Sequence, residues 1–340
     1  MRLLGNLCGS LFSILLMGCL VLFSPVHAQS DKFLEEAKKE GEVVWYATVT
    51  LQTCQAVVKA FEDKYPGIKV RLLRTNSQQQ LTRVVSEYNN KRYNADVIEI
   101  NVQMIAVLKT SGILGKYASS ESQSLPPGFK DPDGYWASNY FIAYSTAYNT
   151  KLVPASQIPK TLEDLLHPRW KQKIMVDSTK PQWFITHLER LGKEKGMAYF
   201  EALGNQQLIS QRGLTMVAQL LAAGEAPLGL FTSTAAIESL RKVGAPVGIA
   251  PISPMICSVD AIGLMARPPH PNAGRLLVDY ILSEAGQRII GENSNIPARP
   301  HVNHPLAAVL EKTSLYPTKP IAVEEYNRLF SLYRSLLHLK

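Results

Sequence analysis

Residues 40 to 74 read EGEVVWYATVTLQTCQAVVKAFEDKYPGIKVRLLR. The short apolar run at 42–47, rich in β-branched and aromatic side chains, predicts a buried strand. A helical pattern follows at 51–65, and the Pro66-Gly67 pair both ends it and makes a turn. A second strand is predicted at 68–74. Strand, helix and strand in this order are typical of two parallel strands joined by a crossover helix.

The same alternation continues as far as residue 101. Residues 78–90 predict a second helix that is capped within 75–77, and DVIEI at 96–100 predicts a third strand. Ligands of parallel sheets bind outside the carboxyl ends of the strands, where the loops enter the helices. Hydrogen-bonding side chains occupy all three of these loops, so we expect a polar cleft there, although each one alone could be an ordinary helix N-cap. The residues are Thr48, Thr50, Asn76, Ser77 and Asn101.

A second α/β unit is predicted after a turn-rich loop at 126–134. Residues 136–149, WASNYFIAYSTAYN, indicate an extended segment that crosses to this unit, and its tyrosines at alternating positions could offer a phenol to a ligand. A helical region around 162–166 leads to a strand at 174–177, and an amphipathic helix is predicted at 214–223. The second unit therefore repeats the strand and helix order of the first.

Hydroxyl side chains follow two strands of the second unit, each at a point where a helix is expected to begin. The free N–H groups and the positive end of a helix can hold an anion together with such hydroxyls. Both clusters are therefore predicted anion sites, with Lys180 as an added charge beside the first. The alternative for the second cluster is an ordinary N-cap. The residues are Ser178 and Thr179 in the first cluster, and Thr232, Ser233 and Thr234 in the second.

Length and composition fit a globular protein of two lobes. The chain has 340 residues, of which 46% are hydrophobic, and a formal net charge of +8. Its basic residues are scattered along the chain rather than gathered in runs, so the sequence does not support binding to nucleic acid. A modest attraction for anionic ligands is the more natural consequence.

The N-terminus has the pattern of an export signal. Arg2 precedes an apolar core at 11–23, and Val26-His27-Ala28 resembles a cleavage site, so we expect a signal peptide at 1–28 and a periplasmic protein. The alternative is a lipoprotein cleavage box at 16–19, which would tether the chain to a membrane through Cys19. The apolar core is short for a transmembrane span of roughly 20 residues.

Two cysteines remain after the expected cleavage, Cys54 and Cys257. In an oxidising compartment such a pair is a candidate disulfide, and the alternative is two buried thiols. Neither cysteine lies in a spacing typical of a zinc site, so we expect no bound metal and no cofactor.

Several stretches of the chain resemble the extracellular solute-binding proteins of ABC importers, and the nearest resemblance is to the group that holds ferric-ion, thiamine, phosphonate and sugar-phosphate binders. The similar stretches run in the expected order over most of the chain. They are EGEVVWYATVT, AFEDKYPGIKV, NADVIEIN, YNT at 148–150, LEDLLHPRWKQKI, AAGEAPLGL and HPNAGRLLVDYILSEAGQ.

This resemblance implies a two-lobed periplasmic-binding-protein-like II fold. Each lobe would be a mainly parallel sheet flanked by helices, and crossing hinge strands would join the lobes. The expected boundaries assign 29–137 and 258–292 to the N-terminal lobe, and 138–257 and 293–340 to the C-terminal lobe. The resemblance also implies a monomer that closes on a small-molecule solute and delivers it to ABC permease subunits in the inner membrane.

The ligand class is predicted from one departure from the resembled group. Ferric-ion binders of the group carry adjacent tyrosines where this chain has Thr232 to Ala235. Hydroxyls that do not ionise are poor ligands for iron, so the departure favours an anionic solute such as a phosphate, phosphonate, sulfonate or carboxylate. A ferric-ion or thiamine binder of the same fold is the alternative.

The sequence bears on two other classes of function. A secreted hydrolase is disfavoured because the chain has neither a G-x-S-x-G nor an H-E-x-x-H motif, and we expect no enzymatic activity. A receptor module that reports occupancy to a sensor rather than to a permease is the remaining alternative. The sequence does not distinguish that role from transport.

Overall fold

The computed structural model describes residues 25–293 and 295–339. The expected signal peptide and Cys19 lie outside these residues, except for 25–28, which begin the first helix, α1 (Pro25–Glu40). Within the described ranges, no helix combines the length and the apolar character that a membrane span requires.

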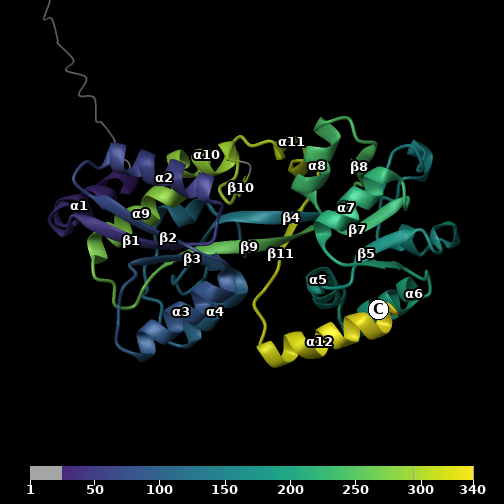
Figure 1. Ribbon diagram of the computed structural model, residues 1–340, viewed down its shortest axis with the longest axis horizontal. Coiled ribbons are helices and arrows are strands. Elements are labelled where there is room, and N and C mark those ends of the chain that lie inside the picture. The colour runs from purple at the N-terminus through teal and green to yellow at the C-terminus, as the bar shows by residue number, and fades with distance from the viewer. Residues whose placement is uncertain (1–24, 294, 340) are drawn as a thin grey trace, which may run out of the picture.

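Two long antiparallel strands join two lobes, as the sequence predicts (Figure 1). They are β4 (Ala137–Asn149) and β9 (Met255–Leu264), which pair from Ala137 opposite Ile262 to Tyr144 opposite Ile256. Strands of both lobes add to this pair, so one sheet runs through the molecule in the order β2-β1-β3-β9-β4-β7-β5-β6. The α/β fold of two lobes with crossing strands is confirmed.

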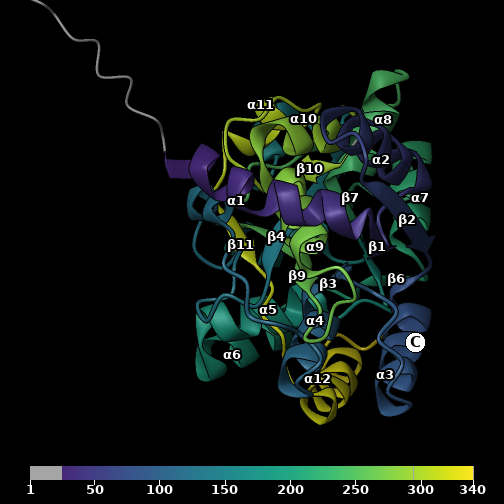
Figure 2. The same ribbon diagram turned by 90° about the vertical axis from the view of Figure 1, so that its left-hand side faces the viewer.

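The first lobe contains the predicted parallel strands and the helices that cover them. Strands β1 and β2 are parallel, β1 is also parallel to β3, and β3 pairs antiparallel with the crossing strand β9. Figure 2 faces this lobe, with α1 lying across it, and α1 packs against α9. Its elements are β1 (Glu42–Ala47), α2 (Leu51–Lys64), β2 (Lys69–Arg74), α3 (Ser77–Asn89), β3 (Val97–Asn101), α4 (Val102–Thr110), η1 (Ser120–Ser124), α9 (Pro271–Leu282), α10 (Glu284–Glu292) and β10 (Ile296–Pro297).

The second lobe repeats this architecture with shorter strands. Strand β5 is parallel to β6 and to β7, and β7 pairs antiparallel with β4. The helical region expected around 162–166 is a short 3-10 helix. The elements are η2 (Ala155–Gln157), η3 (Glu163–Leu166), η4 (Pro168–Trp170), β5 (Ile174–Asp177), α5 (Gln182–Leu191), α6 (Lys193–Gly204), β6 (Ile209–Gln211), α7 (Leu214–Ala223), β7 (Leu228–Ser233), α8 (Thr234–Lys242), β8 (Val247–Ile249), α11 (Ala307–Leu310), β11 (Leu315–Pro317) and α12 (Val323–Leu336), of which α11 and β11 lie between the lobes.

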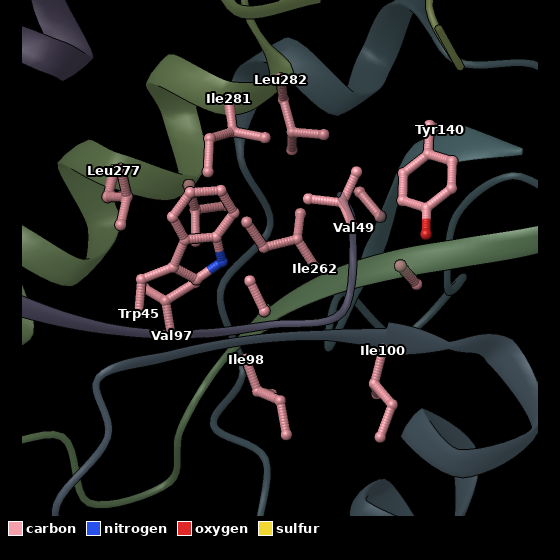
Figure 3. Close-up of a cluster of buried hydrophobic side chains, with 14 of the residues drawn as sticks. Trp45, Val49, Val97, Ile98, Ile100, Tyr140, Ile262, Leu277, Ile281 and Leu282 are labelled. Atoms are coloured by element: carbon pink, nitrogen blue, oxygen red, sulfur yellow. The ribbon is translucent and has the colours of Figure 1, made fainter. Parts of the chain in front are cut away.

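Each lobe has its own hydrophobic core. In the first lobe, Trp45 and Val97 lie on one side of the sheet and Ile98 and Ile100 on the other, because successive side chains of a strand point to opposite faces (Figure 3). Helix α9 covers the Trp45 side with Leu277 and its neighbours. In the second lobe, aromatic side chains of α5, α6 and α12 pack together, among them Phe184, Phe200 and Tyr333.

The cores show where the chain passes between lobes. Tyr140 and Ala143 belong to the first core, so β4 crosses later than the expected boundary at 137. Ile296 and Leu306 also pack in the first core, although 293–340 was assigned to the second lobe. Both differences arise because the crossing segments are extended, so that each of their side chains packs in the core that lies beside it. From Tyr333 onward the chain packs in the second core.

Cys54 and Cys257 are both buried and both free. The candidate disulfide is therefore not formed, and the alternative of two buried thiols describes the structure. The thiol of Cys54 donates to the carbonyl of Val49 at 3.7 Å.

Candidate functional site

Three predicted cleft residues of the first lobe are helix N-caps. The side-chain oxygens of Thr50, Asn76 and Asn101 accept from N–H groups in the first turns of α2, α3 and α4, at 3.3, 2.9 and 3.1 Å. Ser77, which is partly buried, is the first residue of α3. Each cap uses one side-chain acceptor and leaves the rest of the side chain at the edge of the sheet.

Thr48 is held by a carboxylate that was not among the predicted site residues. Glu99 accepts from the Thr48 N–H at 2.8 Å, from the Thr48 hydroxyl at 2.8 Å and from the Val49 N–H at 2.9 Å. These bonds fix the loop between β1 and α2 against the carboxyl end of β3. The sequence signal was an acidic residue inside the otherwise apolar strand DVIEI.

A second buried carboxyl lies beside Glu99 at the crossing of the lobes. Asp260 of β9 pairs with Asn101 on one side and with Tyr140 of β4 on the other, so their side chains share one face of the sheet. Asp260 hydrogen-bonds to the Tyr140 phenol and is 6% exposed. Figure 3 shows Tyr140 on the same side of the sheet as Trp45.

The two carboxyls and the phenol influence one another's protonation. Burial, reinforced by the charge of Glu99, raises the pKa of Asp260 well above its ordinary value. Burial also raises the pKa of Glu99, although the Val49 and Thr48 N–H groups oppose the rise. The pKa of Tyr140 is raised by burial and by both acids, so the phenol stays protonated at neutral pH. Perturbed groups of this kind are typical of functional sites.

The same face of the sheet continues into the second lobe. Ile142 of β4 lies between Tyr140 and Tyr144 and is 38% exposed, although it belongs to a central strand. Tyr144 lies opposite Ser233 of β7 and stacks on Phe231 with ring centroids 4.1 Å apart. Solvent therefore reaches the middle of the crossing strands.

The first predicted anion cluster of the second lobe forms a closed local network. The Thr179 N–H and hydroxyl both donate to Asp177 Oδ1, at 2.9 and 2.7 Å, and the Ser178 N–H and hydroxyl both donate to the Gln211 carbonyl. The other carboxylate oxygen of Asp177 is buried and has no hydrogen-bond partner among the described residues.

The second predicted cluster, at the start of α8, is divided in its roles. Thr232 is fully buried and donates its hydroxyl to the Ser145 carbonyl at 3.0 Å. Ser233 caps α8 by accepting from the Ala236 N–H at 3.4 Å. Thr234 is fully buried, and its hydroxyl has no hydrogen-bond partner within the described residues. Of the three, only Ser233 keeps part of its surface exposed.

A cavity of about 100 Å³ lies between the lobes, and Ser258 of the crossing strand β9 forms part of its wall. Its polar lining is made of amides and hydroxyls, with Lys319 as the charged member. Of the ten predicted ligand-binding residues, Asn101 alone lines it. The lining residues are Asn101, Val102 and Gln103 from the first lobe, Gln182, Ile185 and Thr186 from α5, and Ser258, Thr318, Lys319, Ile321 and Tyr326.

The helix start that faces this cavity has no side-chain cap. Helix α5 follows Pro181, which provides no capping bond, whereas α2, α3, α4 and α8 are all capped. The side-chain oxygen of Gln182 is buried without a hydrogen-bond partner among the described residues, and its nitrogen donates to the Tyr326 hydroxyl at 3.3 Å. Lys180 beside this start is exposed.

Trp183 follows the first hydroxyl cluster in the sequence. Its side chain is buried in the second core against Phe200 and does not line the cavity. The first turn of α5 points it inward. Nowhere in 25–293 or 295–339 do three or more His, Cys, Asp or Glu side chains gather as a group that could hold a metal ion.

Comparison with known proteins places this geometry among solute-binding proteins. The family described as bacterial extracellular solute-binding protein matches residues 94–319. The chain is 21% identical over 304 residues to iron uptake protein A1 of Synechocystis. The aligned region covers 84% of this chain and 83% of that protein.

Solved structures share the fold over nearly their whole length. The Trichodesmium IdiA (FutA) protein in complex with iron and citrate has a TM-score of 0.71 at 21% identity, covering 88% of this chain and 98% of its own. The AfuA protein of Actinobacillus pleuropneumoniae, with fructose-6-phosphate bound, has a TM-score of 0.62 at 23% identity, covering 88% and 99%.

Proposed function

Because this chain belongs to the bacterial extracellular solute-binding protein family, we propose that it captures a small anionic solute between its two lobes. It acts as the solute-binding component of an ABC importer, with a small molecule and permease subunits as its partners. The family works outside the cytoplasm, which agrees with a periplasmic location. Export through a signal peptide at 1–28, and action as a monomer, belong to this proposal.

The observation that carries the choice of an anion is the uncapped start of α5 beside the interlobe cavity. Free N–H groups at a helix N-terminus attract negative charge. Lys180 and Lys319 add positive charge nearby, although Lys319 also pairs with Glu189. The solute would fill the cavity and make contact with residues of both lobes, which favours the closed form.

The predicted hydroxyl residues form the remainder of the proposed site. Ser178 and Thr179 shape the loop before α5, and Ser233 and Thr234 begin α8. On the first lobe, the loops that follow the carboxyl ends of β1, β2 and β3 hold Thr48, Thr50, Asn76, Ser77 and Asn101. Small changes in lobe position would bring these side chains to a solute.

A cationic solute, including ferric ion, is the second candidate, and one observation favours it. Glu99, Asp260 and Tyr140 provide two carboxyls and a phenol on one face of the crossing strands. Oxygen ligands of this kind suit a hard cation, and the Trichodesmium neighbour was solved with iron and citrate. Because the pKa values of all three groups are raised, cation binding would have to release protons.

A thermal-shift screen of the refolded, solute-free protein separates these candidates. The panel is phosphonates, sugar phosphates, carboxylates, thiamine, neutral sugars and Fe(III) citrate, with citrate alone as the matched control. A solute at 100 times its dissociation constant adds about 2.7 kcal/mol, which moves the midpoint by several degrees. Shifts by phosphorylated or carboxylated compounds support an anion. A shift by Fe(III) citrate but not by citrate would reject the anion in favour of the second candidate.

A variant then tests the cavity itself. Gln182→Ala removes a side-chain amide from the cavity lining, and we expect five- to tenfold weaker binding of the solute found in the screen, which corresponds to about one net hydrogen bond. Gln157→Ala is the control, because Gln157 is an exposed glutamine of the second lobe that does not line the cavity. Unchanged affinity of the Gln182→Ala protein, by titration calorimetry, would place the solute elsewhere.

Transport and sensing differ in the protein that recognises the closed form, which is a permease in transport and a sensor in sensing. Neighbouring genes for a permease and an ATPase favour transport, whereas a neighbouring histidine-kinase gene favours a sensor. Assays of the purified protein for phosphatase and esterase turnover test the expectation that it is not an enzyme.

A further inference from the structure

An extended segment runs from the crossing strands to the last helix. Residues 318–322, here called the strap, join β11 to α12 and are visible as the yellow trace that descends beside the gap between the lobes (Figure 1). At its upper end, β11 is parallel to β9, and the Thr318 N–H donates to the Cys257 carbonyl at 2.8 Å. The strap therefore lies along the boundary between the lobes.

A side chain of the first lobe grips the strap through two hydrogen bonds. The amide oxygen of Gln103 accepts from the Ile321 N–H at 2.9 Å, and the amide nitrogen of Gln103 donates to the Ile321 carbonyl. One side chain thus satisfies both backbone groups of one residue, as a neighbouring strand would. Gln103 is the second residue of α4, so the contact is anchored in regular structure.

The strap is attached to the second lobe by other contacts. Lys319 forms an ion pair with Glu189 of α5, and Tyr326 of α12, just beyond the strap, accepts from Gln182 at the start of α5. Among the described residues, the side-chain hydrogen bonds between the first lobe and residues 318–322 all come from Gln103.

We propose that Gln103 and the strap form a latch that holds the lobes closed. Gln103, Thr318, Lys319, Ile321 and Tyr326 all line the interlobe cavity, so the latch and the solute share a wall. A solute that packs there would favour the closed form in which the latch bonds are made. This coupling to the solute rests on the proposed function, whereas the latch itself does not.

The magnitude follows from the two bonds. Each net hydrogen bond contributes enough to change an equilibrium several-fold, so losing both should shift the ratio of closed to open molecules by on the order of tenfold. A protein that opens more readily should also release its solute faster, because a solute can leave only from the open form.

The first test measures hydrogen exchange of the Ile321 amide by NMR in the solute-free protein. Gln103→Ala removes the acceptor, and we expect on the order of tenfold faster exchange. Gln103→Glu retains an acceptor for the Ile321 N–H but cannot donate to the Ile321 carbonyl, so this amide should stay largely protected. Gln78→Ala is the matched control, because Gln78 is also the second residue of a first-lobe helix and is exposed. Equal exchange in the wild type and Gln103→Ala would overturn the latch.

The second test measures the distance between lobes. Spin labels at Ser86→Cys in α3 and Glu201→Cys in α6 sit at exposed positions on opposite lobes, and the two native cysteines are buried. Double electron–electron resonance should show a population of longer distances in Gln103→Ala, a smaller one in Gln103→Glu, which keeps one of the two bonds, and none beyond the wild type in Gln78→Ala. Identical distance distributions in wild type and Gln103→Ala would contradict the proposal.

Both tests are made without solute, so they do not depend on the outcome of the thermal-shift screen. If the screen finds no ligand, the exchange and distance measurements still test the latch. A latch that fails leaves the solute site untouched.

Discussion

Asp260 is a carboxyl kept at an energetic cost. It lies buried next to the buried Glu99, with the Tyr140 phenol as its hydrogen-bond partner. Ionised carboxyls lose hydration when buried, and two neighbouring ones also repel each other. Glu99 offsets its own burial with three hydrogen bonds to the loop at 48–49, whereas Asp260 has no comparable compensation.

Replacement of Asp260 by Asn should therefore stabilise the fold at neutral pH. Because the pKa of Asp260 is raised in the folded state, its favourable contribution is complete below the unfolded value of about 3.9 and is lost as the pH rises through the folded pKa. We expect Asp260→Asn to gain on the order of 1–3 kcal/mol at pH 7. The gain should shrink towards pH 4, as measured by urea unfolding across that range.

Asp133→Asn serves as the control for this prediction. Asp133 is exposed, and the Lys109 ammonium lowers its pKa, so its substitution should bring no gain at pH 7. A stabilisation of Asp260→Asn that is the same at pH 4 and pH 7 would show that ionisation of this carboxyl is not its cause.

The two described cysteines should be unreactive in the native protein. Burial raises the pKa of Cys54 to about 12, and burial also raises the pKa of Cys257, so neither forms the thiolate that attacks a disulfide reagent. We expect no reaction of a protein produced as residues 29–340 with Ellman's reagent until denaturant is added, and two thiols per chain after that. Fewer than two thiols in the denatured protein would indicate that the pair is bridged after all.

At the scale of elements, helix starts explain most of the polar residues at the carboxyl ends of the strands. Asn76, Asn101 and Ser233 each spend one oxygen on a cap. A cap stabilises the helix whether or not a solute binds, so a hydroxyl or amide at such a position contributes to the stability of the fold even without a role in binding. Helices α5 and α7 both begin without a side-chain cap, and of these two only α5 lines the interlobe cavity.

The start of α8 offers a direct test of cap against site. Ser233→Ala should cost about 1 kcal/mol through loss of the cap, while Thr234→Val should be neutral or stabilising because it removes a buried hydroxyl without a partner. If α8 also holds the anion, the combined variant Ser233→Ala and Thr234→Val should bind the solute several-fold more weakly by calorimetry. Full affinity in a folded double variant would exclude α8 from the site.

Regular elements could be read from the sequence because they are decided locally. The predicted strand at 42–47 is β1, and the predicted helix at 214–223 is α7. The break between α9 and α10 is harder to predict, because a single residue, Ser283, separates the two helices and caps the second. The partners of Glu99 and of Gln103 lie 50 and 218 residues away, so no periodicity or local motif could have predicted them.

At the scale of the whole molecule, closure should be visible as a change of shape. Two lobes joined by β4, β9 and the strap can rotate about these segments when a solute fills the cavity. We expect the radius of gyration from small-angle X-ray scattering to fall when the solute from the screen is added. The Gln182→Ala protein should need more solute for the same change. A radius that stays constant at saturating solute would mean that binding does not close the lobes.

The composition of the first lobe's core also determines when that lobe can finish folding. Part of the first lobe's core comes from Ile290, Ile296 and Leu306, which are made long after β1 to β3. That lobe can complete its packing only after nearly the whole polypeptide has been synthesised. An N-terminal fragment that ends before Leu306 therefore lacks part of the first core and should not fold as an independent domain.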